Sequence, residues 1–252
     1  MGSRNMNTKT SDKTATATAE KKMKLTDFRA LTFDCYGTLI DWESGILSAL
    51  KVVLASRGLF PAAGEILTRY ADYESEAEAS AYIPYRQVLR EVVRRFGATY
   101  GFSPDPAELE CLDRSLPQWK PFDDTASALK RLRKRFRLAV LSNIDDDLFA
   151  QTRAKLGVTI DHAVTAEQVG AYKPSPAMFA ALIKHTTGDP RSILHVAQST
   201  FHDIIPGRAA GLATVWVRRD SARAVFGATP AVSPQPDMEV PDLLTLATLA
   251  RV

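Results

Sequence analysis

Apolar residues recur along the chain with two different spacings, and each spacing predicts a different kind of element. Short apolar runs, which are typical of buried strands, occur at residues 30–33, 138–141, 162–164, 193–197 and 214–217. Spacing by three or four positions, which predicts helices, occurs near residues 148–156, 177–184, 204–210 and 243–249. This alternation predicts an α/β fold built on a doubly wound, Rossmann-like parallel sheet.

A long segment after the first run has the helical spacing alone. Between residues 45 and 116 the apolar positions repeat at helical intervals, most clearly at 46–54 and 88–96, and no strong strand interrupts them. The sequence therefore predicts an all-helical domain inserted after the first strand. The expected division is a disordered tail at 1–24, a core domain at 25–44 and 117–252, and a helical domain at 45–116.

Two segments of the chain have neither spacing. Residues 1–24 are polar and rich in Thr, Lys and Ala, which is typical of a disordered tail, in part an addition made for expression. Near the other end, prolines predict an irregular segment before the closing helix, and they are Pro230, Pro234, Pro236 and Pro241.

Length and charge are compatible with this division. The chain has 252 residues, enough for one large domain or for a core with a smaller insertion. Its formal charge of +3 is spread along the sequence, so no nucleic-acid partner is expected. The basic run at 130–137 is interpreted as the exposed face of a helix that leads into a strand. The alternative, an RNA-binding surface, lacks aromatic platform residues.

The two cysteines and the hydropathy of the chain indicate its compartment. Cys35 and Cys111 have neither CxxC nor zinc-site spacing, which favours a reducing cytoplasm. Cys35 is interpreted as a packing residue, because side chains alternate along a strand. No apolar stretch approaches ~20 residues, so neither a signal peptide nor a membrane span is expected. The protein is therefore expected to be soluble and cytoplasmic, with no membrane partner.

Polar residues follow several of the apolar runs. Asp34 follows the first run at a predicted turn, and Ser142 and Asn143 end the second. Lys173 precedes a proline that can open a helix, and Asp203 lies in the polar loop after the fourth run. Each of these residues can be a turn former, a helix cap or a surface lysine. Because the carboxyl ends of parallel strands meet at one edge, they also form a candidate site with Asp34 as its nucleophile.

The order and spacing of these residues resemble the haloacid dehalogenase superfamily. Its four motifs are an Asp nucleophile, a Ser or Thr, a Lys and a terminal acid. The matching residues are Asp34 in FDCYGTL, Ser142 in LSN, Lys173 in YKPSP and Asp203 in HVAQSTFHD. The resemblance implies that the helical insertion is a cap domain, which covers the crevice of the core and excludes water.

Two departures from the superfamily pattern indicate the subfamily. Phosphatases of the superfamily carry a second Asp two residues after the nucleophile, where this chain has Tyr36. A halide leaving group needs no proton, whereas an alkoxide does, so the pattern resembles the L-2-haloacid dehalogenases. Metal-dependent members have an Asp where this chain has Gln198, which should weaken Mg²⁺ binding. The expected cofactor is none; the alternative is Mg²⁺ held by Asp34 and Asp203.

The resemblance also implies a role for each site residue. Asp34 would attack C2 of the substrate and form an aspartyl ester. Water, activated by Asp203 with help from Lys173 or His202, would then attack the carbonyl of that ester. His195 lies inside a strand and is interpreted as a packed histidine.

Ser142 and Asn143 would hydrogen-bond the carboxylate of Asp34 or of the substrate. In the resembled dehalogenases a cap arginine binds the anion, and Arg69 is the nearest local match, with Arg86 as the alternative. The apolar wall is expected from Tyr70, Tyr85 and Trp42. The expected substrate-binding residues are Tyr36, Trp42, Arg69, Arg86 and Ser199.

These features predict a hydrolytic dehalogenase that converts small 2-haloalkanoic acids into 2-hydroxy acids. The dehalogenases have a Ser-Asn-aromatic-Asp loop where this chain has a different one, so the substrate stays open. The alternatives are a Mg²⁺-dependent phosphatase, a hydrolase of another electrophilic carbon such as a strained ring, and a non-catalytic binding protein. The expected partners are the small 2-haloacid and halide, and a homodimer is left open.

Overall fold

The computed structural model describes residues 23–79, 81–219, 221 and 235–252. Within these residues, six parallel strands form one sheet in the order β3-β2-β1-β4-β5-β6. The strands are β1 (Ala30–Phe33), β2 (Arg137–Ser142), β3 (His162–Thr165), β4 (Ile193–Ala197), β5 (Ala213–Val217) and β6 (Met238–Val240). The first strand lies at the centre of the sheet, where Phe33 is opposite Val140 on one side and Val196 on the other. All four residues of β1 are buried, as expected for a parallel sheet covered on both faces.

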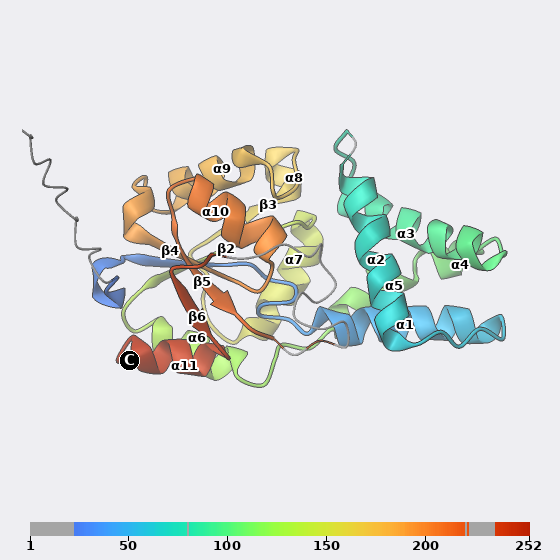
Figure 1. Cartoon of the computed structure of the whole chain (residues 1–252), viewed down its shortest axis with the longest axis horizontal. Helices are drawn as coiled ribbons and strands as arrows, with labels where there is room; N and C mark the ends of the chain where they lie inside the picture. The colour runs from blue at the N-terminus through green and yellow to red at the C-terminus, as the bar shows by residue number, and fades with distance from the viewer. Residues whose placement is uncertain (1–22, 80, 220, 222–234) are drawn as a thin grey trace, which may run out of the picture.

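Helices cover both faces of the sheet. Figure 1 shows α8, α9 and α10 along one face and α6 and α11 packed together on the other. The helical elements of the core are η1 (Leu25–Asp27), α6 (Thr125–Leu132), α7 (Asp146–Arg153), η3 (Ala154–Leu156), α8 (Ala166–Val169), α9 (Pro176–Thr186), η4 (Pro190–Ser192), η5 (Thr200–Ile204), α10 (Ile205–Ala209) and α11 (Leu243–Leu249). The fold is therefore the predicted Rossmann-like α/β fold.

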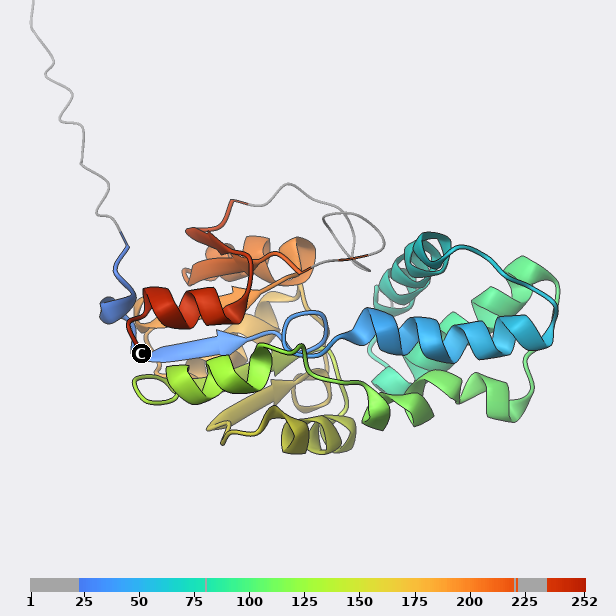
Figure 2. The same ribbon diagram turned by 90° about the horizontal axis from the view of Figure 1, so that it is seen from below.

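A group of helices between β1 and α6 forms the cap, beyond the carboxyl ends of the strands (Figures 1 and 2). Its elements are α1 (Trp42–Ser56), α2 (Ala63–Glu78), α3 (Tyr85–Tyr100), α4 (Pro106–Leu109), α5 (Cys111–Ser115) and η2 (Leu116–Gln118). The apolar stripe of α3 is buried, and the helix ends at Gly101, whose φ of 76° suits a residue without a Cβ. Among the described residues, no helix has both the length and the hydropathy needed to cross a bilayer.

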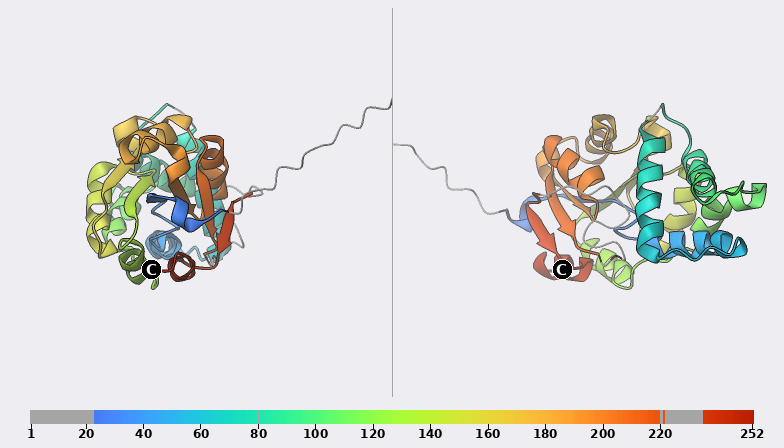
Figure 3. Two further views of the ribbon diagram at one scale, coloured as in Figure 1. Left: turned by 90° about the vertical axis from the view of Figure 1, so that its left-hand side faces the viewer. Right: turned by 45° about the vertical axis from the view of Figure 1, so that its right-hand side comes forward.

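The two chain segments that join the core to the cap lie side by side. The amide of Asp41 donates to the Lys120 carbonyl oxygen at 2.8 Å, and the amide of Phe122 donates to the Leu39 carbonyl oxygen at 3.1 Å. The cap therefore begins and ends at one place on the core. Figure 3 shows its helices gathered on the right of the molecule, away from the C-terminus.

One strand differs from the prediction. The strand β6 lies between Pro236 and Pro241, in a segment that the prolines predicted to be irregular, and it pairs in parallel with β5. Three residues are too few to show a clear apolar pattern, and prolines are tolerated beside an edge strand. Pro230 and Pro234 lie outside the described residues, as does most of the tail predicted at 1–24.

The basic run belongs only partly to a helix. The helix α6 ends at Leu132, a turn follows, and β2 begins at Arg137. Arg133 in this turn forms an ion pair with Asp161, which precedes β3. The run therefore continues past the helix into a turn at the edge opposite the cap.

Candidate active site

Asp34 is held at the carboxyl end of the central strand by a tight turn. Gly37 in this turn has a φ of 94°, which favours glycine. The turn brings the hydroxyl of Thr38 back to Asp34, where it donates to Oδ2 at 2.6 Å. The same hydroxyl accepts a hydrogen bond from the amide of Gln198 at 2.9 Å, which ties the turn to the end of β4. Thr38 was not singled out from the sequence, although it belongs to the FDCYGTL motif.

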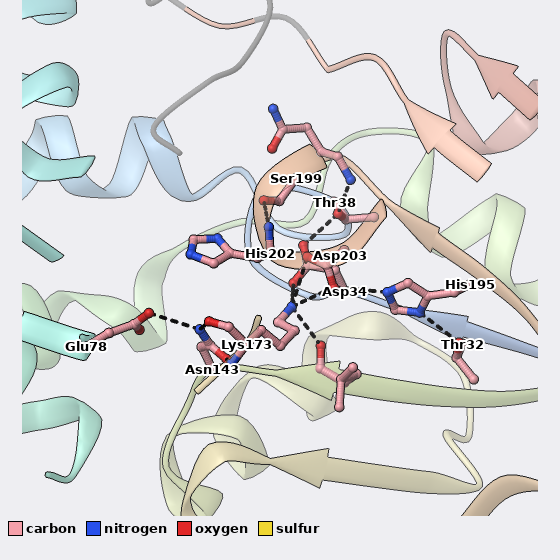
Figure 4. Close-up of polar contacts among 12 residues, drawn as sticks. Thr32, Asp34, Thr38, Glu78, Asn143, Lys173, His195, Ser199, His202 and Asp203 are labelled. Atoms are coloured by element: carbon pink, nitrogen blue, oxygen red, sulfur yellow. Dashed lines mark hydrogen bonds and ion pairs between the residues drawn. The ribbon is translucent and has the colours of Figure 1, made fainter. Parts of the chain in front are cut away.

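The ammonium group of Lys173 lies between two carboxylates (Figure 4). Its Nζ is 2.7 Å from Oδ1 of Asp34, and 2.9 and 3.1 Å from the two carboxylate oxygens of Asp203. It also donates to the carbonyl oxygen of Leu141 at 3.2 Å. All three charged side chains are at least nine-tenths buried. The structure thus brings together the three residues on which the sequence prediction depends most.

Burial and charge act in opposite directions on these groups. Burial raises the pKa of Asp34 above its ordinary value, although the Lys173 ammonium opposes this. Burial also acts to raise the pKa of Asp203, but Lys173 and a hydrogen bond from His195 outweigh it and lower the pKa. Burial acts to lower the pKa of Lys173, and the two carboxylates more than reverse this. Lys173 therefore stays charged at neutral pH.

A buried histidine orients Asp203. The Nε2 atom of His195 is 2.9 Å from Oδ1 of Asp203, and its Nδ1 atom is 2.8 Å from the hydroxyl of Thr32. A carboxylate can only accept a hydrogen bond, so we place a proton on Nε2, and the Thr32 hydroxyl then donates to Nδ1. His195 is packed in the core, as interpreted from the sequence, yet it also contacts the site. Thr32 and His195 are opposite each other in the β1–β4 pairing, a register that the sequence did not supply.

The loop after β4 lines the pocket with a second histidine. The Ser199 hydroxyl accepts a hydrogen bond from the amide of His202 at 3.0 Å, which caps the following turn. Burial and the nearby Lys173 lower the pKa of His202 to about 4. The imidazole of His202 is therefore neutral at pH 7 and able to accept a proton. Ser142, buried at the end of β2, lines the same pocket.

The hydrogen bonds of Asn143 go to Lys173 and Glu78 and not to Asp34, so of its two expected partners only the substrate stays a prediction. Its Oδ1 accepts a hydrogen bond from the amide of Lys173 at 2.7 Å, and its Nδ2 donates to the carbonyl oxygen of the same residue at 3.2 Å. Nδ2 also donates to Oε2 of Glu78 at 3.1 Å. Asn143 therefore fixes the backbone of Lys173 and joins it to the cap. Both N–H groups of the amide are used by these contacts, which leaves none to donate to the nucleophile.

The pocket lies where the core meets the cap. It has a volume of about 40 Å³ and adjoins a groove of about 400 Å³. Its described lining residues are Asp34, Tyr36, Trp42, Glu74, Glu78, Tyr85, Ser142, Asn143, Lys173, Ser199, His202 and Asp203. Glu78, Lys173 and His202 line both the pocket and the groove. Of the residues predicted to form the apolar wall, Trp42 and Tyr85 line the pocket, while Tyr70 packs edge-on against Trp42. Tyr36, predicted to bind substrate, also lines the pocket.

Two glutamates of α2 face the pocket from the cap. Oε1 of Glu74 accepts hydrogen bonds from the hydroxyls of Tyr70 at 2.8 Å and Tyr85 at 2.6 Å. Burial raises the pKa of Glu74 to about 7, and burial beside Glu74 raises the pKa of Glu78 well above its usual range. Sequence reasoning missed both residues. Their spacing of one helical turn was the available signal, but the same spacing is common on exposed acidic helices.

Neither candidate arginine lines the pocket, which corrects a second expectation. Arg69 lies on the same face of α2 as Glu65, to which its Nε donates at 3.1 Å, and its guanidinium stacks 5.5 Å from the ring of Tyr100. Arg86 points to the core, where its Nη1 donates to Asp147 at 3.0 Å. The rotation of each helix about its own axis determines which side chains face the pocket, and local sequence does not give that rotation.

An aspartate of the core caps a helix of the cap. The carboxylate of Asp145 accepts hydrogen bonds from the amides of Tyr85 at 2.8 Å and Arg86 at 3.1 Å, the first residues of α3. The residue before this helix is Pro84, which has no side-chain acceptor of its own. The hydroxyl of Tyr172 also donates to the carbonyl oxygen of Ile83 at 2.7 Å. These contacts hold the cap over the pocket.

The donor set of the pocket is a poor fit to Mg²⁺. The carboxylates of Asp34 and Asp203 already share the Lys173 ammonium, while a hard cation takes six or more oxygen ligands. Gln198 is not among the residues that line the pocket, and the hydroxyl of Tyr36 is bonded to Thr152 at 2.8 Å. Among the described residues, no group of three or more His, Cys, Asp or Glu is placed to hold a metal. No step of the chemistry below is routed through a metal.

The chain combines a parallel α/β sheet with an inserted helical cap. An aspartate follows the central strand, and later loops supply a lysine and a second acid. This combination is typical of capped hydrolases. The chain belongs to the haloacid dehalogenase-like hydrolase family, whose model matches residues 28–211.

Among its relatives, (S)-2-haloacid dehalogenase H-109 of Pseudomonas putida is 28% identical over 212 residues, which cover 79% of this chain and 90% of that protein. The glyceraldehyde 3-phosphate phosphatase of Methanopyrus kandleri is 27% identical over 189 residues, covering 66% of this chain and 76% of that protein. Among solved structures, an L-2-haloacid dehalogenase from Xanthobacter autotrophicus superposes with a TM-score of 0.75 at 24% identity, covering 89% of this chain and 98% of that one. The sequence relatives thus include both dehalogenases and phosphatases.

Proposed function

We propose that this chain hydrolyses a bond between carbon and a leaving group that needs no proton, with halide as the natural example. The observation that carries the proposal is the setting of Asp34. Its two oxygens are held by Lys173 and Thr38, and Tyr36 stands where an acid would protonate an alcohol. Relatives named (S)-2-haloacid dehalogenase support a carbon–halogen bond as the target.

In the first step, a carboxylate oxygen of Asp34 attacks the carbon that carries the halogen. The new C–O bond forms as the C–X bond breaks, and the electron pair leaves with halide. Lys173 and Thr38 fix the orientation of the carboxylate, so the attacking oxygen needs little reorganisation. Lys173 also favours the ionised form of Asp34 against the effect of burial.

In the second step, water attacks the carbonyl carbon of the Asp34 ester. The Lys173 ammonium, 2.7 Å from Oδ1, stabilises the negative charge that develops there. Asp203 and the neutral imidazole of His202 both line the pocket, and either accepts the proton of the attacking water. The bond between the Asp34 carbonyl carbon and the substrate oxygen then breaks, and the base returns the proton to the departing oxygen, which releases the hydroxy product and restores the carboxylate of Asp34.

The alternative is a Mg²⁺-dependent phosphatase, the activity for which another relative is named. A phosphate ester needs an acid for its leaving alkoxide and a cation for its phosphoryl oxygens. Tyr36 and Gln198 stand where such enzymes of the superfamily carry acids. We therefore propose a reaction without a metal, and begin its test with the small 2-haloalkanoic acids of the relatives.

Halide release tests the proposal directly. Release from a panel of 2-chloro compounds should persist in EDTA and vanish in Asp34→Asn, because an amide is a very poor nucleophile. Mass spectrometry of the variant excludes deamidation. Loss of activity in EDTA with recovery on Mg²⁺, or phosphate release in place of halide release, would contradict the proposal.

A single turnover in ¹⁸O-water tests the covalent step. The oxygen of the first product comes from Asp34, so the product should be unlabelled and the label should appear in Asp34. Direct attack of water on the substrate carbon would label the product at once. Labelled product in the first turnover would leave Asp34, at most, a general base.

A further inference from the structure

The charges that line the pocket are unevenly divided between core and cap. The described lining residues include four carboxyl groups, from Asp34, Asp203, Glu74 and Glu78, and a single cation, Lys173. Lys173 already contacts both aspartates of the core. No positive charge in the described lining therefore remains for a substrate group that faces the cap side of the pocket.

The arginines of α2 and α3 are engaged elsewhere. Arg69 pairs with Glu65, and Arg86 pairs with Asp147 of the core. Arg90 donates to Glu110 and Asp113 at 3.1 and 3.3 Å, and Arg95 pairs with Glu76 and Glu91. Arg94 pairs with Glu91, and none of these five arginines is among the described residues that line the pocket or the groove. An anionic group on a substrate would therefore receive no compensating positive charge from these arginines.

The two glutamates are placed to accept hydrogen bonds from a ligand. Both tyrosine hydroxyls bond to Oε1 of Glu74, so Oε2 takes no part in either bond. Asn143 bonds to Oε2 of Glu78, and Oε1 takes no part in that bond. Each carboxyl thus has one oxygen fixed by the protein, which orients the side chain, and a second oxygen that the contact does not use. Figure 4 shows Glu78 reaching from the cap towards Asn143.

The groove adds aromatic faces beside Glu78. Its described lining includes Tyr82, Tyr172 and Phe201 together with Glu78 and His202, and the rings of Tyr82 and Tyr172 are 5.3 Å apart. Carboxylates and aromatic faces both attract N–H groups and ammonium groups. Glu78 lines the groove and the pocket alike, so a ligand that extends from one into the other passes it.

We propose that the substrate carries an N–H group, an amide or an ammonium, where a 2-haloacid carries its carboxylate, and that Glu74 and Glu78 select it. This inference rests on the proposed function for its reaction, but it concerns the part of the substrate that does not react. The core supplies the nucleophile, and the two glutamates of α2 act as specificity-determining residues.

Binding of three unreactive compounds of similar size tests the selection apart from the reaction. Lactamide, 1-amino-2-propanol and lactate differ in one group, which is an amide, an ammonium or a carboxylate. Titration calorimetry at pH 7.5 should show at least one of the two N–H compounds binding about tenfold tighter than lactate. The tighter of the two identifies the group. Tightest binding of lactate, equal binding of all three, or binding of none overturns the inference.

The variant Glu78→Gln assigns the preference to the pocket. A glutamine amide can donate to a carboxylate, so the variant should bind lactate more tightly than the wild type does. The difference in affinity between the N–H compound and lactate should therefore become smaller. Glu76→Gln is the matched control, since Glu76 is an exposed residue of the same helix and pairs with Arg95. An unchanged preference in Glu78→Gln, or the same change in Glu76→Gln, overturns the inference.

Turnover separates this inference from the proposed function. Halide release is measured from 2-chloropropionamide and from 2-chloropropionate. Release from neither compound, with the binding preference intact, contradicts the proposed reaction and leaves the selection by Glu74 and Glu78 standing. Release from the acid at least tenfold faster than from the amide, at equal concentration below saturation, overturns the inference and leaves the reaction standing.

Discussion

The core wall and the cap wall of the pocket hold carboxyl groups in opposite ways. On the core wall, Asp34 and Asp203 share a buried ammonium, which lowers the pKa of Asp203 and opposes the rise that burial causes in the pKa of Asp34. On the cap wall, Glu74 is held by two tyrosine hydroxyls, and its pKa is raised to about 7. An ammonium partner favours the ionised carboxylate against the effect of burial, whereas the two tyrosine hydroxyls lower the pKa of Glu74 too little to offset its burial. The comparison suggests that reaction and selection are divided between the two domains.

Removal of the ammonium should have the largest effect. In Lys173→Met the carboxylates of Asp34 and Asp203 lie buried together without a cation. We expect turnover to fall by more than about 10²-fold and the free energy of unfolding to fall by about 3–5 kcal/mol. Halide release and urea unfolding measure the two effects, with the exposed Lys184→Met as control. A wild-type rate at pH 7 in Lys173→Met would show that the core wall does not depend on this charge.

The raised pKa of Glu74 on the cap wall should make the free energy of unfolding depend on pH. The pKa of Glu74 is about 7 in the folded protein against an ordinary value of 4.5, so the folded state binds more protons and stability falls as pH rises between these values. Glu74→Gln keeps an acceptor for Tyr70 and Tyr85 and removes this titration. Its stability relative to the wild type should rise from pH 4.5 to pH 7, by on the order of 3 kcal/mol.

Chemical unfolding at several pH values measures this difference between Glu74→Gln and the wild type. Glu74 also contributes to the raised pKa of Glu78, so Glu74→Gln should lower the pKa of Glu78, which changes the relative stability in the same direction. Parallel stability curves would mean that Glu74 is ionised throughout the range, and the contrast between the two walls would fail.

The junction between the walls should show a smaller effect. Asp145→Ala leaves the amides of Tyr85 and Arg86 without their acceptor, and loss of a helix cap costs about 1–2 kcal/mol. Asp145→Asn keeps one acceptor oxygen and should lose less. Hydrogen exchange at the amides of Tyr85 and Arg86 reports directly on their hydrogen bonds to Asp145. Unchanged protection of both amides in Asp145→Ala would show that the core does not cap α3.

The smallest effect is expected at Arg69. Its side chain is partly exposed and pairs within its own helix, and such surface pairs contribute about 0–1 kcal/mol. Arg69→Ala should therefore keep its turnover within about twofold. The same assay with 2-chloropropionate probes the absence of a cation from the described cap wall. A rise of KM by about 10²-fold for the acid alone would show that Arg69 binds the carboxylate of the substrate.

Local pattern and one topological rule were enough to predict the core wall. Asp34 and Asp203 follow apolar runs, Lys173 precedes a helix start, and carboxyl ends of parallel strands meet at one edge. The position of Thr32 opposite His195 was not predictable, because it depends on strand register between segments 163 residues apart.

The cap wall could not be predicted in the same way. Glu74, Glu78 and Arg69 all belong to one amphipathic helix, and local sequence does not say which side of it meets the core. Packing of α2 against α1 and α3 sets that rotation, and it turns the glutamates inward and the arginine outward. The resemblance to dehalogenases indicated an arginine because it matches residues along the sequence. It does not say which side of the helix faces the pocket.

The adjacent linkers give the protein a modular construction. Asp41 and Lys120 are hydrogen-bonded, so residues 42–119 leave and rejoin the core at one point, and insertions are tolerated where chain ends lie close together. Lys173, Thr38 and His195, which hydrogen-bond the carboxylates of Asp34 and Asp203, all belong to the core. Exchange of the inserted segment for another helical one should therefore leave the nucleophile in place while it changes which molecules reach it. Evolution can then retain one reaction and vary its substrates by replacing a single stretch of chain.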